Sequence, residues 1–161
     1  MGRNTQGVKG IALRKGDRVI GVDTVREDFA TILTVTEHGY GKRTQVGQYK
    51  RQHRGGMGLI DIKTTDRNGK VVGQSIVTGE DEAMLITQAG KVIRIPTGGV
   101  KVQGRNTMGV KMIDVGDEDR VVALARLAED ESAAAQIAAT VAGKPIPQIA
   151  RERPARTSHG F

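Results

Sequence analysis

Three motifs rich in arginine and glycine hold the side chains of this chain that are best suited to bind a ligand. Arg3, Arg54 and Arg105 are spaced at intervals of 51 residues, and each is followed four positions later by a glycine. An exposed guanidinium group presents N–H donors in a planar fork that matches the oxygen atoms of a phosphate. Glycine permits the backbone conformations that a tight turn requires. The spacing therefore predicts three equivalent turns that offer arginine to an anionic ligand.

The repeat extends beyond these motifs. Apolar residues alternate with polar ones after each closing glycine, as in 58–62 and 109–113, and this pattern indicates a half-buried strand. A polar turn such as Asn68-Gly69 and three further β-rich stretches complete a unit of about 50 residues, the size of one propeller blade. The predicted strands cover residues 7–11, 17–21, 32–36, 40–44, 58–62, 69–73, 83–87, 91–95, 109–113 and 119–123.

These strands predict an all-β fold, a partial propeller-like repeat of four-stranded antiparallel blades with a period of 51 residues. Residues 1–127 hold about two and a half blades of this size. Propellers close with about four to eight blades, so we expect the chain either to be part of a longer repeat protein or to assemble with other chains. In both cases the strand edges on the N-terminal side should be exposed.

The composition changes after residue 127. Residues 128–143 are rich in alanine, with acidic residues at the start that suit a helix N-terminus, and Gly143 and Pro145 would end such a helix. Its apolar face is narrow, so we expect a linker or a marginal helix. Residues 144–161 combine prolines with cations and are expected to form a disordered basic tail.

The charge of the chain is strongly positive and unevenly distributed. A net charge of +7 and a pI of about 10.0 favour a polyanion as the partner. Residues 1–16, 38–60 and 83–113 contain no acidic residue, so each blade would offer a basic stretch at the same place in its own fold. Stacked blades would join these stretches into one positive band, and a duplex along it would be held by salt-sensitive phosphate contacts. Few aromatic residues interleave the cations, so we expect sequence-tolerant binding of double-stranded DNA without base stacking.

The candidate DNA-binding residues are cations of these basic stretches together with the glutamine and glycines of the central motif. They are Arg3, Lys9, Lys42, Arg43, Lys50, Arg51, Gln52, Arg54, Gly55, Gly56, Gly58, Arg94, Lys101, Arg105 and Lys111.

Other chemistries have little support in the sequence. Tyr40 and Tyr49 invite comparison with a covalent tyrosine mechanism, but neither has an evident activating base or metal site. The histidines lack the spacing of metal ligands, and the absence of cysteine excludes disulfide and thiolate chemistry. We therefore expect no catalysis and no cofactor for this chain alone. The rival interpretation is a protein-binding, kelch-like propeller, although such a propeller has no need for a basic stretch in every blade.

The central motif, Gln52-His53-Arg54-Gly55-Gly56-Met57-Gly58, resembles the characteristic box of the C-terminal domain of the bacterial DNA gyrase A protein. That box reads Gln, basic, Arg, Gly, Gly, basic, Gly, so His53 and Met57 mark this copy as a degenerate box of a late blade. The stretches 39–44 and 104–107 resemble further segments of the last blades, and the resemblance covers about residues 2–127. It implies a β-pinwheel, a propeller-like ring whose blades exchange strands, with DNA wrapped around the rim to favour negative supercoiling.

The same resemblance implies the surroundings of the domain. The partners would be double-stranded DNA, the gyrase B protein and the N-terminal part of gyrase A, in the bacterial cytoplasm at the nucleoid. ATP and Mg²⁺ would serve the holoenzyme, a type II topoisomerase whose catalytic tyrosine domain has no counterpart in this chain. The corresponding protein of topoisomerase IV carries a related pinwheel and is the close alternative.

Overall fold

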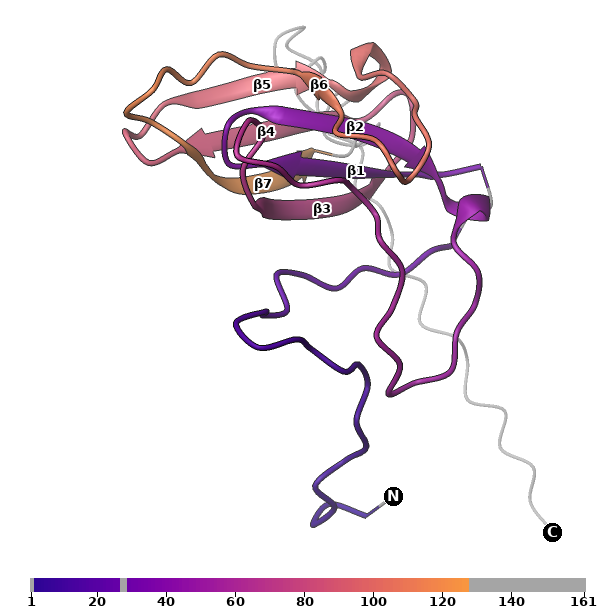
Figure 1. Ribbon diagram of the computed structural model, residues 1–161. Helices are drawn as coiled ribbons and strands as arrows, with labels where there is room; N and C mark the ends of the chain where they lie inside the picture. The colour runs from indigo at the N-terminus through magenta and orange to yellow at the C-terminus, as the bar shows by residue number, and fades with distance from the viewer. Residues whose placement is uncertain (1, 27–28, 128–161) are drawn as a thin grey trace, which may run out of the picture. The chain divides into compact units, whose positions relative to one another are not determined.

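Two antiparallel sheets pack against each other in the computed structural model, which describes residues 2–26 and 29–127 (Figure 1). The first sheet has the strand order β3-β1-β2-β6 and the second has the order β5-β4-β7. The strands are β1 (Thr31–Thr36), β2 (Tyr40–Gln45), β3 (Val71–Val77), β4 (Glu82–Thr87), β5 (Val92–Pro96), β6 (Val110–Lys111) and β7 (Val121–Leu127). Short 3-10 turns, η1 (Val46–Gln48) and η2 (Thr97–Gly99), follow β2 and β5. No helix in the described ranges is long and apolar enough to cross a membrane.

The two sheets are copies of one another in detail. Thr31 pairs with Gln45 in the first hairpin, and Glu82 pairs with Pro96 at the same place in the second. The ladder formed by β1 and β3 shifts register after Val35, and the ladder formed by β4 and β7 shifts after Ile86, which is 51 residues further. A shift at the same position in both copies is a feature of the repeat and not a local irregularity. The predicted all-β repeat is therefore confirmed.

Strand exchange between blades is present in the first sheet. The short strand β6 follows the third arginine–glycine motif, yet it pairs with β2, where Tyr40 faces Lys111. A strand contributed by a later repeat thus completes the four-stranded first sheet, which is the arrangement that a pinwheel requires. The second sheet has three strands in the described part of the chain.

Three of the predicted strands are wrong. Residues 7–11, 17–21 and 58–62 have no regular structure, whereas the segments equivalent to them include β3, β6 and β7. A strand needs a neighbour to pair its backbone groups, and β2 supplies one to β6. The hairpin of β1 and β2 pairs with β3 and β6. The described residues contain no further hairpin that would pair in the same way with 17–21 or 58–62. Most of their apolar side chains are accordingly exposed, as the sequence predicts for the N-terminal side, with Val8 at 56% and Val19 at 64% exposure, whereas Ile62 is buried.

The core lies between the two sheets and is entirely aliphatic. Leu33, Val77, Leu85 and Val121 have no exposed surface, and together they draw on both sheets. Each such side chain contributes about 1.5–3 kcal/mol relative to full exposure. This burial fixes the positions of the loops that leave the sheets.

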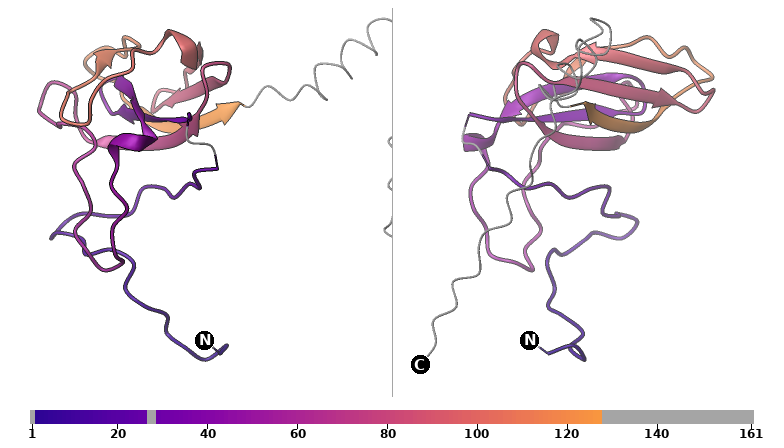
Figure 2. Two further views of the ribbon diagram at one scale, coloured as in Figure 1. Left: turned by 90° about the vertical axis from the view of Figure 1, so that its right-hand side faces the viewer. Right: turned by 180° about the vertical axis from the view of Figure 1, so that it is seen from behind.

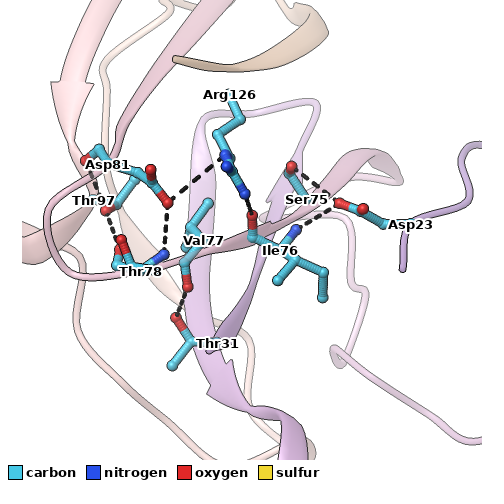
Figure 3. A network of polar contacts seen from close by, with 9 residues as sticks. All are labelled: Asp23, Thr31, Ser75, Ile76, Val77, Thr78, Asp81, Thr97 and Arg126. Atoms are coloured by element: carbon cyan, nitrogen blue, oxygen red, sulfur yellow. Dashed lines mark hydrogen bonds and ion pairs between the residues drawn. The ribbon is translucent and has the colours of Figure 1, made fainter. Parts of the chain in front are cut away.

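A polar network at the turn between β3 and β4 joins the two sheets (Figure 3). The buried carboxylate of Asp81 accepts the amide of Thr78 at 2.7 Å and lies 3.7 Å from Nε of Arg126 on β7. Arg126 also donates to the carbonyl oxygen of Ile76 at 3.0 Å. On the outer edge of β3, the amide of Ile76 donates to Asp23 at 2.8 Å, so a side chain of the N-terminal segment occupies part of that edge. These bonds tie three separate segments to one strand.

The predicted alanine-rich helix or linker at 128–143 and the predicted tail at 144–161 lie outside the described residues.

Candidate nucleic-acid interface

The three arginine–glycine motifs form turns of closely similar local geometry, which we name the first turn (residues 2–7), the second turn (residues 53–58) and the third turn (residues 104–109). Their closing glycines have φ angles of 79°, 77° and 79°, in the left-handed region that favours glycine. In the first turn the hydroxyl of Thr5 donates to the carbonyl of Gly2 at 2.8 Å, and in the third Thr107 donates to Gly104 at 2.9 Å. The equivalence inferred from spacing thus extends to backbone conformation.

Successive turns are docked onto one another by a repeated hydrogen bond. The amide of Ala12 donates to Gly56 of the second turn at 2.8 Å, and the amide of Lys63 donates to Thr107 of the third turn at 2.9 Å. Both donor and acceptor advance by 51 residues from one contact to the next. Each of these turns therefore lies on the segment that follows the turn before it. Figures 1 and 2 show the N-terminal segment alongside the loop that joins β2 to β3.

One group of candidate cations is exposed on the docked turns and their flanks. Within residues 2–26 and 29–127, no hydrogen bond or ion pair engages their charged groups, so those groups are available to a ligand. They are Arg3, Lys9, Lys50, Arg51, Arg54 and Lys101. Lys50 and Lys101 occupy equivalent positions in successive repeats, as do Arg3 and Arg54.

Arg105 belongs to the third turn but is held more firmly. Its Nη1 donates to the carbonyl oxygen of Ile60 at 3.2 Å, and its guanidinium carbon lies 5.8 Å from the centre of the Tyr49 ring. A guanidinium over an aromatic face keeps part of its fork open to solvent. Arg105 is therefore an oriented cation, whereas Arg3 and Arg54 have no such restraint in the described structure.

Lys42 corrects the sequence interpretation. Its side chain has no exposed surface, and its ammonium donates to the carbonyl oxygens of Asp61 at 2.6 Å, Gly104 at 2.7 Å and Arg105 at 2.7 Å. All three ammonium donors are used, so Lys42 cannot contact a phosphate in this fold. The prediction that it binds DNA directly is wrong, because residues distant in sequence enclose it.

Three further candidates are engaged with the protein. Arg43 donates to the carbonyl oxygens of Val100 at 2.9 Å and Gly98 at 3.3 Å. Arg94 pairs with Glu82, and Lys111 pairs with Asp114 at 2.8 Å. Both carboxylates lie just outside the basic stretches of the sequence, so acid-free stretches do not remain acid-free in space.

The remaining candidates of the central motif have mainly structural contacts. The amide of Gly55 donates to Gly10 at 2.7 Å, so that N–H is not free for an anion. Gly58 supplies the positive φ that closes the second turn, and Gly56 accepts the docking hydrogen bond. Gln52 is exposed beside them.

Sequence reasoning missed a partly buried polar cluster next to the third turn. The carboxylate of Asp61 accepts hydrogen bonds from the hydroxyl groups of Tyr49 and of Thr34, the latter at 2.6 Å. Burial, followed by the Asp61 hydrogen bond, raises the pKa of Tyr49, so its hydroxyl stays protonated and is no activated nucleophile. A comparison of the repeats gives a signal for this cluster, because the equivalents of Thr34, Lys42, Tyr49 and Asp61 are the apolar residues Leu85, Ile93, Val100 and Met112.

The fold and the repeated turns have counterparts among known proteins. A family described as "DNA gyrase C-terminal domain, beta-propeller" matches residues 1–26, 30–77 and 81–128. The chain belongs to this family. Membership in the DNA gyrase C-terminal domain family accounts for the exchanged strand, and it sets aside the kelch-like interpretation of the propeller.

Individual relatives agree with the gyrase family. The DNA gyrase A protein of Staphylococcus aureus, strain MRSA252, is 44% identical over 131 residues, which are 81% of this chain and 15% of the relative. The chain thus spans a small part of the curated relatives that it matches. A solved DNA gyrase A C-terminal domain is 32% identical with a TM-score of 0.72, covering 80% of this chain and 43% of that structure. A C-terminal domain of DNA topoisomerase IV, at 20% identity, shares the fold with a TM-score of 0.74, covering 83% of this chain and 43% of that structure.

Proposed function

We propose that this chain is a module of a gyrase A-type protein that binds duplex DNA and wraps it. The observation that carries the proposal is the set of unpaired cations on successive docked turns, at Arg3, Lys9, Lys50, Arg51, Arg54 and Lys101 within the described residues. Repetition of the docking hydrogen bond supports a regular progression of these cations from one repeat to the next. A regular series of cations fits the regular spacing of phosphates better than it fits a folded protein surface.

The chemistry of the surface favours duplex DNA over single strands. The aromatic rings available in the described part are Tyr40, Tyr49 and Phe29, and each tyrosine ring lies under an arginine, Arg67 or Arg105. Base stacking along a strand needs several free aromatic faces, and among the described residues Phe29 alone offers an exposed ring without an arginine over it, so phosphate contact is the main source of affinity. Phosphate contacts carry no base information, and binding is sequence-tolerant.

The proposal includes the assembly in which the chain acts. Gyrase B and the N-terminal part of gyrase A hydrolyse ATP and cleave DNA with the help of Mg²⁺. This chain sets the path of the duplex DNA at the bacterial nucleoid. Wrapping of the DNA around this module with a single handedness supports negative supercoiling by that holoenzyme. The 44% identity with the DNA gyrase A protein makes gyrase the preferred parentage over topoisomerase IV, whose C-terminal domain supports only a shared fold.

Two measurements on the 161-residue chain test the proposal. The first is fluorescence anisotropy with duplex and single-stranded DNA of equal length across a salt series, with tighter, steeply salt-dependent duplex binding expected. The second is ligation of a nicked plasmid in the presence of the chain, followed by removal of protein and resolution of topoisomers. Chiral wrapping shifts the linking number, whereas simple binding leaves it unchanged. Absence of duplex binding would overturn the whole proposal, and binding without a linking-number shift would overturn wrapping alone.

A further inference from the structure

The buried ammonium of Lys42 connects two separate segments of the chain. It donates to three carbonyl oxygens, and two of these, Gly104 and Arg105, belong to the third turn. The remaining acceptor is the carbonyl of Asp61, on the segment against which that turn is docked. One side chain from β2 therefore joins the third turn to its docking segment. Charge-assisted hydrogen bonds are about twice as strong as neutral ones, which makes this a firm attachment.

The surrounding cluster completes the attachment. The carboxylate of Asp61 compensates the Lys42 charge and accepts the Tyr49 hydroxyl, which fixes the Tyr49 ring. That ring in turn lies under the Arg105 guanidinium. Lys42 thus holds the backbone carbonyl of Arg105, and the Tyr49 ring holds its side chain. Burial lowers the pKa of Lys42 while Asp61 opposes this effect, in keeping with a charge retained at a cost.

The neighbouring repeat shows that the fold itself has no need of this cluster. The hairpin of β4 and β5 is built on the same register, yet the repeat that begins with this hairpin has Leu85, Ile93, Val100 and Met112 at the four equivalent positions. Replacement of buried charged groups by well-packed apolar residues is often neutral or stabilising. A buried charge retained in one repeat and absent from the next therefore points to a specific structural task.

We propose that Lys42, together with Asp61 and Tyr49, is a positioning device that holds the third turn so that Arg105 faces a DNA phosphate. This inference rests on the proposed duplex binding. Lys42 does not touch DNA; it acts through the backbone of Arg105. Its contribution to affinity should therefore disappear when the Arg105 side chain is removed.

A double-mutant cycle tests the proposal by duplex affinity. We expect Lys42→Met and Arg105→Ala each to weaken binding by roughly three- to tenfold and to reduce the salt slope by about one. The double variant should bind no worse than Arg105→Ala alone. In an Arg51→Ala/Arg54→Ala background, Lys42→Met should keep its full effect, because those cations are not held by the cluster. A general structural defect would instead make Lys42→Met weaken binding equally in the Arg105→Ala background and in the Arg51→Ala/Arg54→Ala background.

A second variant keeps the test decisive if Lys42→Met fails to fold. The substitutions Thr34→Leu, Lys42→Ile, Tyr49→Val and Asp61→Met together install the apolar set of the neighbouring repeat. We expect cooperative unfolding to be retained, with duplex binding reduced to the level of Arg105→Ala. Normal binding by this folded variant, or no effect of Arg105→Ala, would overturn the inference while leaving the proposed function intact. Failure of the unmodified chain to bind duplex would instead overturn the proposed function.

Discussion

Gly109 packs directly against the backbone of Gly41, where a β-carbon on Gly109 would lie 2.6 Å from the Gly41 carbonyl oxygen. Gly109 closes the third turn at a φ of 79°, and Gly41 lies on β2 in the pair with Val110. The close approach is what lets the exchanged strand β6 reach the first sheet. Gly58, its equivalent in the second turn, has the same conformation but meets only Ile11, at 3.7 Å.

This difference predicts unequal costs for the same substitution. Gly58→Ala should lower the free energy of unfolding by about 1–2 kcal/mol, the cost of a left-handed conformation for alanine. Gly109→Ala should lower it by about 1–3 kcal/mol more, because the added carbon also overlaps the Gly41 carbonyl. Urea unfolding followed by far-ultraviolet circular dichroism measures both. Equal midpoints for the two variants would contradict the packing described here.

Arg54 of the second turn and Arg51 on its flank should make a large contribution to duplex binding. Arg51→Ala/Arg54→Ala should weaken duplex binding and reduce the slope of log affinity against log salt by about 1–2. The matched control is Arg67→Ala/Arg120→Ala, which removes the same charge from exposed arginines outside the three basic stretches, where they contact Tyr40 and Gln88. Its salt slope should be nearly unchanged. Equal slopes for the two double variants would reduce the effect to net charge.

Asn68 should not tolerate replacement by aspartate, although aspartate occupies the equivalent positions of the other repeats. Its equivalents are aspartates, yet its buried side-chain amide donates to the carbonyls of Lys63 at 3.0 Å and Met108 at 3.2 Å. Asn68→Asp removes both donors and places a carboxylate against carbonyl oxygens, so we expect a loss of about 2–4 kcal/mol in unfolding free energy. The control Asn106→Asp, on an exposed position, should change stability by less than about 0.5 kcal/mol. A small effect at Asn68 would argue that the amide is not needed.

Asp23 should make stability depend on pH in the acidic range. The backbone N–H of Ile76 is the main cause that lowers the pKa of Asp23 below its ordinary value of 3.8 (Figure 3). A lowered pKa in the folded state contributes stability that is complete above the unfolded value and is lost as pH falls through the folded value. The difference in urea midpoint between the unmodified chain and Asp23→Asn should therefore be constant near neutral pH and shrink as the pH falls below 3.8, the ordinary pKa of this carboxyl group. A difference that persists at low pH would show that the carboxylate charge is irrelevant.

The hairpins could be predicted from sequence because their information is local. The alternating residues of 32–36 and 40–44, with Gly39 between them, specify a tight turn and two facing strands within a single stretch. The same holds for β4 and β5. The strands predicted at 7–11, 17–21 and 58–62 failed for the opposite reason, since a strand forms only where a distant partner is present.

The period, the two hairpins and the turns that carry arginine can be predicted from the residues alone, because they depend on residue type and on short spacing. Tertiary structure alone decided which cations remain free. Lys42 and Arg43 lie in the same basic stretch as Arg51 and Arg54, yet the first two are engaged by carbonyl groups from beyond residue 60 while the last two are exposed. Whether a cation is engaged within the fold or exposed to solvent depends on hydrogen-bond acceptors that come from distant repeats. A local sequence pattern contains no information about these acceptors.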